Sequence, residues 1–212
     1  MSVISVLNQK GGTGKSTIAI NLAVGFAKDS KKVLLIDTDH QRSSMIWYAN
    51  REEEEPPVSV ISIPEAGALK RAVSDHQQNY DILIIDGTPS EDRLTTISIS
   101  VSDLVIVPLQ PSALDFWSTE TLAERILQAQ DLGTVKGRYL LTRYPPTATH
   151  LGKEVEALVA EQEMPMFSTK IHNRIAYADS ISANQSVWSW ANGKALEEIE
   201  SLYDEVREIL NA

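Results

Sequence analysis

Lys10-Gly-Gly-Thr-Gly-Lys-Ser-Thr17 is the stretch of this sequence that decides its fold. It follows the short apolar run Val3–Leu7 and opens an amphipathic stretch typical of a helix. A glycine-rich turn between a strand and a helix can point its backbone N–H groups at phosphate oxygens, and the helix N-terminus adds the positive end of its dipole. The stretch therefore predicts a phosphate-binding loop.

Two lysines and a serine give this loop its chemistry. Lys15 can reach the β- and γ-phosphates of a nucleotide, and the Ser16 hydroxyl can ligate Mg²⁺. Where the usual loop pattern has glycine this chain has Gln9, and it carries a second lysine, Lys10, before the glycines. The residues that we expect to bind nucleotide are Gly11, Gly12, Thr13, Gly14, Lys15, Ser16 and Thr17.

Apolar strands that end in aspartate predict the other half of the site. Val33–Asp37 is followed by Asp39, and the two carboxylates are spaced to face the same way where ligands of open α/β sheets bind. Tyr80–Asp86 has the same form, with four apolar residues before Asp86. A carboxylate in this position holds Mg²⁺ through water, so Asp86 is a metal candidate together with Ser16.

Short apolar runs recur through the chain, with helical stretches between them. The expected strands are Val3–Leu7, Val33–Ile36, Val58–Ile63, Ile82–Ile85, Leu104–Val107 and Tyr139–Leu141. The expected helices cover 15–28, 43–51, 65–77, 90–100, 113–131, 151–162 and 194–210. This alternation predicts a three-layer P-loop α/β fold, a mostly parallel twisted sheet flanked by helices, formed by residues 1–212 as a single domain. The acidic run Glu52–Glu55 is expected to be a solvated surface turn.

Composition excludes several classes of site. The 212 residues include no cysteine, which excludes disulfides, thiolate zinc sites and cysteine-held iron–sulfur clusters. The net charge is −10, so binding to a polyanion would have to depend on a local basic patch. The first residues do not resemble a signal peptide, and no apolar run reaches the ~18 residues that span a bilayer. We therefore expect a cytoplasmic protein.

The loop and the segments around it resemble a known family. Lys10–Ser16 resembles the deviant Walker A motif of the ParA/MinD ATPases, and Val101–Trp117 resembles the segment that follows the Walker B strand in short plasmid-type ParA proteins. The resemblance covers residues 1 to about 200. It implies the short form, without a helix-turn-helix domain before Met1.

The resemblance implies roles for individual residues. Lys10 would cross a nucleotide-sandwich dimer and contact the partner's phosphates, as an arginine finger does. Asp39 would orient or activate the attacking water, and Asp37 would support the Mg²⁺ shell beside Ser16 and Asp86. Lys10, Lys15 and Asp39 are thus the catalytic candidates. His40 stands where the family has proline, which affects local rigidity but not the carboxylates.

The resemblance also reaches the nucleotide base and the dimer interface. It assigns Thr142 and Arg143 to base recognition, with Arg143 as an ordinary surface charge the alternative. The sequence contains no Asn-Lys-x-Asp guanine signature, which favours ATP over GTP as the cofactor, with Mg²⁺. Asp115 and Trp117 are placed at the dimer interface by resemblance alone.

The first functional hypothesis is a ParA-type, Mg²⁺-dependent ATPase that converts ATP and water to ADP and phosphate. Its ATP-bound homodimer would bind DNA non-specifically on the nucleoid and position a plasmid, a chromosome region or a protein assembly. A ParB-like adaptor would stimulate hydrolysis. The DNA-binding candidates are Lys170, Arg174 and Lys194, each of which could also be a plain surface charge. The first two lie one helical turn apart if Lys170 begins a helix.

Two other classes remain open. A MinD-like membrane-positioning ATPase would need a basic amphipathic C-terminal helix. The polar face of Glu197–Leu210 is instead acidic, and its apolar residues fit a helix packed on its own domain. A metabolic P-loop ATPase would turn over ATP steadily without DNA or an adaptor. Within that class, the nitrogenase-type reductase is excluded because it needs cysteine ligands.

Overall fold

A six-stranded parallel sheet forms the centre of the computed structural model, which describes residues 1–52, 55–89, 92–133, 135–145, 150–190 and 193–211. The strands are β1 (Ser2–Val6), β2 (Val33–Asp37), β3 (Val58–Ser62), β4 (Ile82–Asp86), β5 (Leu104–Leu109) and β6 (Lys136–Leu141). Their spatial order is β3-β2-β4-β1-β5-β6, and every pairing is parallel. The expected sheet is therefore confirmed.

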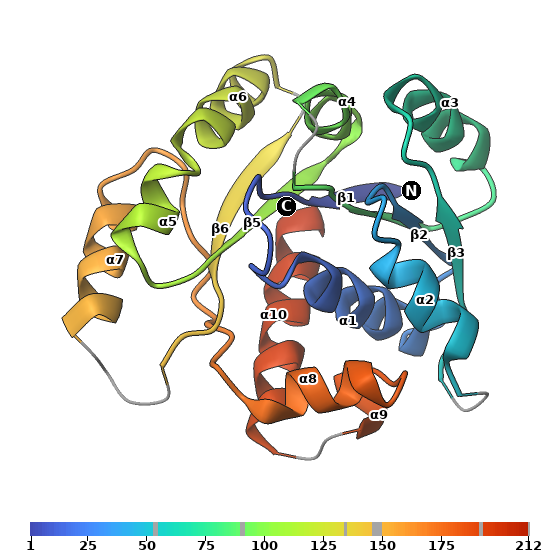
Figure 1. The fold of residues 1–212 in the computed structure, drawn as a ribbon. Coiled ribbons are helices and arrows are strands. Elements are labelled where there is room, and N and C mark those ends of the chain that lie inside the picture. Colours follow the sequence, from blue (N-terminus) through green and yellow to red (C-terminus); the bar gives the residue numbers. More distant parts are fainter. Residues whose placement is uncertain (53–54, 90–91, 134, 146–149, 191–192, 212) are drawn as a thin grey trace.

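Helices cover both faces of this sheet (Figure 1). One face carries α1 (Lys15–Lys28), α2 (Ser43–Asn50), α8 (Ile175–Ser182), α9 (Val187–Trp190) and α10 (Lys194–Asn211). The other carries α3 (Ala66–His76), α4 (Asp92–Val101) and α6 (Glu120–Asp131), with α5 (Ala113–Trp117) and α7 (His150–Ala160) beside β6. The three-layer fold is confirmed.

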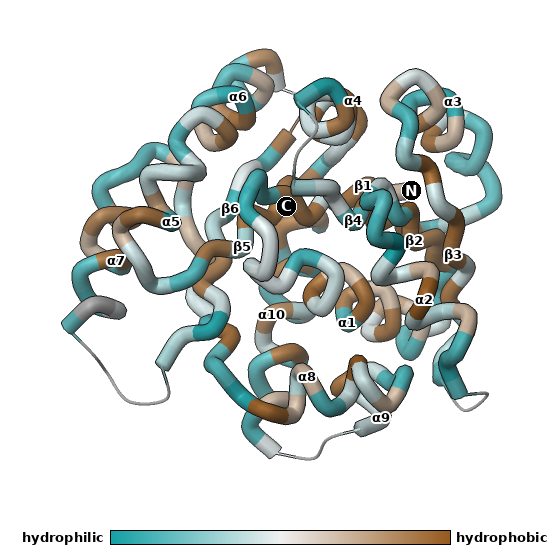
Figure 2. The backbone as a smooth tube through the Cα atoms, in the orientation of Figure 1, coloured by the Kyte–Doolittle hydropathy of each residue, from teal (hydrophilic) through white to brown (hydrophobic). Residues whose placement is uncertain are grey.

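The inner strands β2, β4 and β5 are buried along their whole length and are mostly apolar, because both faces of the sheet are covered. In β2, Leu34 and Ile36 pack toward α3 and α4, whereas Val33 and Leu35 pack toward α1. Alternate residues of a strand point to opposite faces, so a strand between two helical layers has no solvated side. Figure 2 shows the same pattern, with hydrophobic strands inside and hydrophilic outer helix faces.

The expected helix boundaries need three corrections. The single helix expected over 113–131 is two helices, because the Ser118 and Thr119 hydroxyls bond back to the carbonyls of Asp115 and Phe116. Helices α8 and α9 were not anticipated, because each is too short for a clear periodic pattern. Lys170 does not begin a helix: α8 begins at Ile175, so the spacing expected from Lys170 to Arg174 is wrong.

The expectation of a solvated turn over Glu52–Glu55 is wrong at Glu55, and residues 53–54 lie outside the described residues. Glu55 is buried, and its carboxylate accepts hydrogen bonds from the Ser186 backbone N–H (2.8 Å) and hydroxyl (2.9 Å to Oε2). A buried charge needs such partners. This contact fastens the chain between α2 and β3 to the residue before α9. No local pattern could predict a partner so distant in the sequence.

The C-terminal helix packs as expected. Ile199, Leu202 and Val206 of α10 are fully buried against α1 and the sheet, and Ile209 and Leu210 are partly buried on the same cluster. The apolar face of α10 is thus used within the domain. Among the helices of the described residues, none has the length and apolar character needed to cross a membrane.

Candidate nucleotide-binding site

The phosphate loop joins β1 to α1, as the sequence predicts (Figure 1). Gly12 and Gly14 have φ values of 75° and 92°, in the left-handed region that side chains with a Cβ rarely adopt. The buried Lys15 turns into the loop, where its Nζ donates to the Lys10 carbonyl oxygen at 2.9 Å. The backbone curl and the inward lysine are the two parts that a phosphate cradle needs.

Two strand ends bring the expected carboxylates to the same edge. Asp37 and Asp86 are register partners in the β2–β4 ladder, and Asp86 is also paired with Val6 at the end of β1. Both carboxylates are fully buried. Asp39 follows β2 and is half-buried, and its backbone N–H donates to Asp37 Oδ1 at 3.0 Å.

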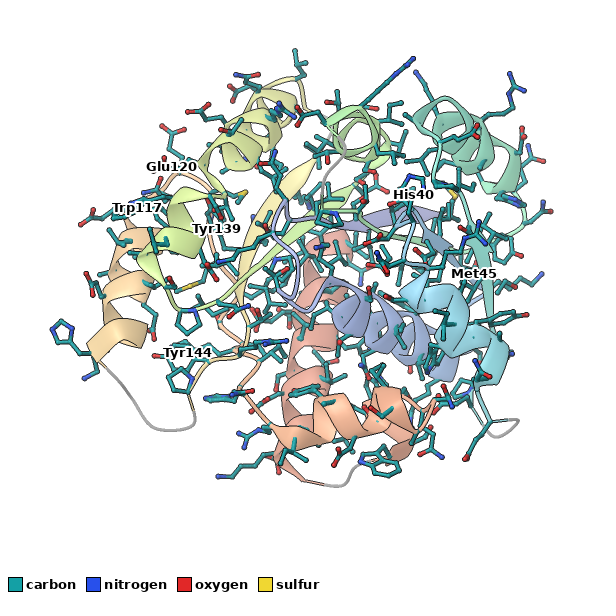
Figure 3. All side chains as sticks on the ribbon, in the orientation of Figure 1. His40, Met45, Trp117, Glu120, Tyr139 and Tyr144 are labelled. Carbon is teal, nitrogen blue, oxygen red and sulfur yellow. The ribbon has the colours of Figure 1, made fainter. Side chains whose placement is uncertain are left out.

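The start of α2 is tied to these carboxylates, a feature that the sequence did not announce. The Ser44 hydroxyl donates to Asp86 Oδ2 at 2.7 Å, and the Met45 backbone N–H donates to Asp37 Oδ2 at 3.1 Å. His40, labelled in Figure 3, lies in the turn between β2 and α2, and Met45, also labelled, lies in the first turn of α2. The start of α2 therefore holds Asp37 and Asp86, and the turn before it carries Asp39.

Burial dominates the electrostatics of the site. It raises the pKa of Asp86 to about 7, an increase that the Ser44 hydroxyl opposes and the nearby Asp37 reinforces. The pKa of Asp37 is raised for the same reason, against three backbone hydrogen bonds that lower it. Burial lowers the pKa of Lys15, while Asp86 and Asp39 raise it. Lys15, Asp39 and Asp86 therefore interact across one small volume.

The residues fit a nucleotide with Mg²⁺. Asp86 Oδ1 is buried and, within the described ranges, accepts no hydrogen bond of good geometry, so it is available to the water shell of a cation. The described residues contain no cluster of three or more His, Asp or Glu side chains that could hold a metal alone. Such an arrangement suits Mg²⁺, which binds through phosphates, water and one or two carboxylates.

A cavity of about 500 Å³ adjoins the loop where the base is expected. Gly14, Thr17, Thr142 and Arg143 line it, so the structure brings together residues that the sequence assigned separately. The Thr142 hydroxyl donates to the Thr13 carbonyl oxygen at 2.9 Å, which holds the loop against the end of β6. Arg143 is exposed and has a φ of 49°.

Sequence reasoning missed the far wall of this cavity. It is formed by Ile171–Arg174, by Tyr177, Ala178, Ile181 and Ser182 of α8, and by Ile18 of α1. Residues 171–173 run beside 141–144: the Ile171 N–H donates to the Leu141 carbonyl, and the Asn173 N–H to that of Tyr144. An isolated bridge of this kind carries no periodic pattern, so no signal in the sequence could have found it.

Lys10 lies differently from Lys15. Its Nζ forms an ion pair with Asp115 of α5, whose carboxylate is almost fully buried, whereas the Lys10 side chain is 47% exposed. The same helix exposes two large apolar side chains, Leu114 (72%) and Trp117 (54%). Lys10 therefore lies at the surface and is held by α5 of its own chain.

The three DNA-binding candidates do not form one patch of free cations. Lys170 pairs with Glu156 at 2.7 Å and lies over the Tyr144 ring, and Arg174 pairs with Glu198 at 2.6 Å. Arg174 also lines the cavity. Lys194 begins α10 and is exposed.

Comparison with known proteins agrees with this geometry. Residues 4–187 match the model of the CobQ/CobB/MinD/ParA nucleotide binding domain. A curated relative, the maintenance of carboxysome distribution protein A of Gloeobacter kilaueensis, is 29% identical over 219 residues, covering 99% of this chain and 94% of that protein.

Two solved structures share the fold. An apo McdA structure superposes with a TM-score of 0.81 at 18% identity, covering 99% of each chain. The cobyrinic acid a,c-diamide synthase of Mycobacterium smegmatis, with a bound ATP analogue and magnesium, gives a TM-score of 0.78 at 22% identity, covering 98% of this chain and 94% of that one.

Proposed function

Since the chain belongs to the CobQ/CobB/MinD/ParA nucleotide-binding family, we propose that it is a Mg²⁺-dependent ATPase that positions a cargo. ATP drives formation of a two-fold sandwich dimer, the dimer binds DNA without sequence preference, and an adaptor stimulates hydrolysis and release. The name of the carboxysome-distribution relative favours a protein assembly as cargo over a plasmid or a chromosome region. The ATP-bound dimer would then reside on the nucleoid within the cytoplasm.

The contrast between Lys10 and Lys15 carries this proposal. Lys15 is buried and turned into its own loop, whereas Lys10 is half-exposed and paired with Asp115 of α5, a helix that also exposes Leu114 and Trp117. A single phosphate loop needs only the buried lysine. A second lysine at the surface, paired with a helix that exposes apolar side chains, suits a charge supplied to the nucleotide of a second copy.

Each residue of the site has a role in this proposal. The loop amides and Lys15 bind the phosphates, and Ser16, Asp37 and Asp86 hold the shell of the metal. The metal, when bound, neutralises charge on the phosphates. Asp39, half-buried and electrostatically coupled to Lys15, orients the attacking water. Lys10 stabilises the charge that develops in the transition state, as an arginine finger does.

The alternatives have less support from the molecule. A MinD-like membrane helix would need a free apolar face on α10, and Ile199, Leu202 and Val206 of that helix are buried within the domain. The likeness to the diamide synthase is a likeness of fold, and the same fold hosts different chemistries. A metabolic ATPase would turn over steadily with neither DNA nor adaptor.

The test follows ATP-dependent dimerisation and DNA binding together. Sedimentation velocity with a non-hydrolysable ATP analogue and Mg²⁺ is expected to show a dimer for the wild type and a monomer for Lys10→Ala that still binds nucleotide. Asp39→Ala should bind ATP and dimerise but not hydrolyse it. Binding to unrelated DNA should require ATP and weaken for Lys194→Glu, with Lys70→Glu on the opposite helical layer as the matched control.

Four outcomes would contradict the proposal. A wild-type protein that stays monomeric with bound nucleotide, or a Lys10→Ala variant that still dimerises, would contradict the role given to Lys10. Equal DNA binding with and without ATP would contradict the coupling of DNA binding to ATP. Normal hydrolysis by Asp39→Ala would remove the role given to that carboxylate.

A further inference from the structure

We infer that Glu198 is the positioning residue that sets the wall of the base cavity and so makes nucleotide binding depend on the base. The inference rests on the proposed ATP site, which it deepens. Glu198 lies on α10, outside the nucleotide motifs, and does not line the cavity itself. It would act through His172, Arg174 and Tyr177, which do line it.

One carboxylate gathers these three wall residues. Glu198 Oε1 accepts from Arg174 Nε at 2.8 Å and lies 2.8 Å from His172 Nδ1. Its Oε2 accepts from the Tyr177 hydroxyl at 2.8 Å and from the His172 backbone N–H at 3.1 Å. The Glu198 side chain is only 11% exposed, so these contacts are screened little by solvent.

Burial alone would raise the pKa of Glu198, but the hydrogen bonds from Arg174, Tyr177 and the His172 N–H together hold this pKa below its usual value. The carboxylate is therefore charged at neutral pH, and its donors depend on that charge. Conversely, the hydrogen bond to Arg174 raises the pKa of that guanidinium, and burial with the bond to Glu198 raises the pKa of Tyr177. The contacts thus keep Glu198 and Arg174 charged and Tyr177 neutral, as a rigid wall requires.

On the side of α10, the wall is held by Glu198 and by a 3.2 Å hydrogen bond from the Tyr177 hydroxyl to the Ala195 carbonyl oxygen. On its opposite side, residues 171–173 are bonded to the backbone that continues β6. Glu198 thus holds residues 171–174 between α10 and the sheet, where these residues line the cavity. Loss of Glu198 would free His172 and Arg174 to move into the cavity, while the phosphate loop, fixed by α1 and Thr142, would keep its shape.

The chain provides a matched control on the same helix. Glu205 lies on α10 and accepts from the Ser168 N–H at 2.8 Å and the Thr169 N–H at 2.7 Å. It fastens the same segment to the same helix, but Ser168 and Thr169 do not line the cavity. If both glutamates only stabilised the fold, replacing either one would have the same effect on nucleotide binding.

The experiment compares two ligands by calorimetry in the full chain, with Mg²⁺: a non-hydrolysable ATP analogue and inorganic tripolyphosphate, which has no base. Glu198→Ala is expected to lose affinity for the ATP analogue by about tenfold and to keep its affinity for tripolyphosphate within about twofold. Glu198→Gln keeps the shape of the side chain, so its affinity for the ATP analogue should lie between those of the wild type and Glu198→Ala. It replaces the alanine variant in the test if that variant does not fold. Glu205→Gln should change the affinity for neither ligand. Thermal unfolding should nevertheless show that the variants at position 198 and the variant at position 205 are all less stable than the wild type.

The outcomes separate the inference from the proposed function. If the wild type prefers the ATP analogue to tripolyphosphate and both Glu198 variants keep that preference, the inference is wrong and the nucleotide site stands. Equal losses for both ligands, or a loss of the ATP preference in Glu205→Gln, would also overturn it, because either result describes general damage. A wild type without any preference would show that no base is held in this cavity, and the proposed ATP site would fall as well.

Discussion

Asp115→Asn is expected to strengthen ATP-dependent dimerisation. In the single chain, Lys10 is paired with Asp115, so a lysine that serves a second copy must first leave this partner. Because the Lys10 side chain is 47% exposed, solvent screens the pair, and its contribution is about 1 kcal/mol, or roughly fivefold. A two-fold dimer breaks two such pairs, so removing the charge of Asp115 should lower the dimer dissociation constant by roughly 25-fold.

Sedimentation velocity over a range of protein concentrations, with a non-hydrolysable ATP analogue and Mg²⁺, measures this constant. Asp92→Asn is the matched control, because Asp92 also forms an ion pair, with Arg125 at 3.1 Å, on other elements of the fold. The control should leave the constant unchanged. An unchanged constant in Asp115→Asn, or the same gain in Asp92→Asn, would refute the reasoning.

Two further predictions concern stability. Gly25→Ala should destabilise the fold by about 1 kcal/mol and lower the melting temperature by about 2–4 °C, because its Cβ would lie 2.9 Å from the Trp188 ring and the overpacking exceeds the gain in helix propensity. Gly67→Ala, whose Cβ would meet nothing within 4 Å, should instead be neutral or stabilising, and equal melting temperatures would contradict the packing argument. The lowered pKa of Glu198 stabilises the fold above the unfolded value of 4.5, and this stabilisation is lost as the pH falls through the lower folded pKa. The stability difference between wild type and Glu198→Gln, from urea unfolding, should therefore shrink below pH 4.5, and a difference that grows there would show the sign to be wrong.

The sequence predicted the sheet, the glycine-rich loop after β1 and the common edge of the strand-end carboxylates, for a physical reason. Strands of a parallel sheet end at the same edge, so Asp37 and Asp86 could be placed near the loop from their positions alone. The roles of Gly12 and Gly14 followed equally from local backbone chemistry.

Contacts between distant parts of the chain could not be predicted in this way. Glu55 meets Ser186, and Glu198 meets His172, through side chains whose pairing depends on the finished fold. The segment 168–174 has neither the period of a helix nor that of a strand. The far wall of the base cavity, and the true surroundings of Lys170 and Arg174, became visible only in three dimensions.

The order of the strands also has a consequence for biosynthesis. β1, the first strand of the sheet in chain order, lies between β4 and β5, with Ser2 opposite Ile82 and Ile4 opposite Leu104. The nascent chain must therefore carry the apolar residues of β1 unpaired until β4 and β5 have been made. Pairings between such distant segments form slowly, so the centre of this sheet should close late and depend on protection from aggregation while translation continues.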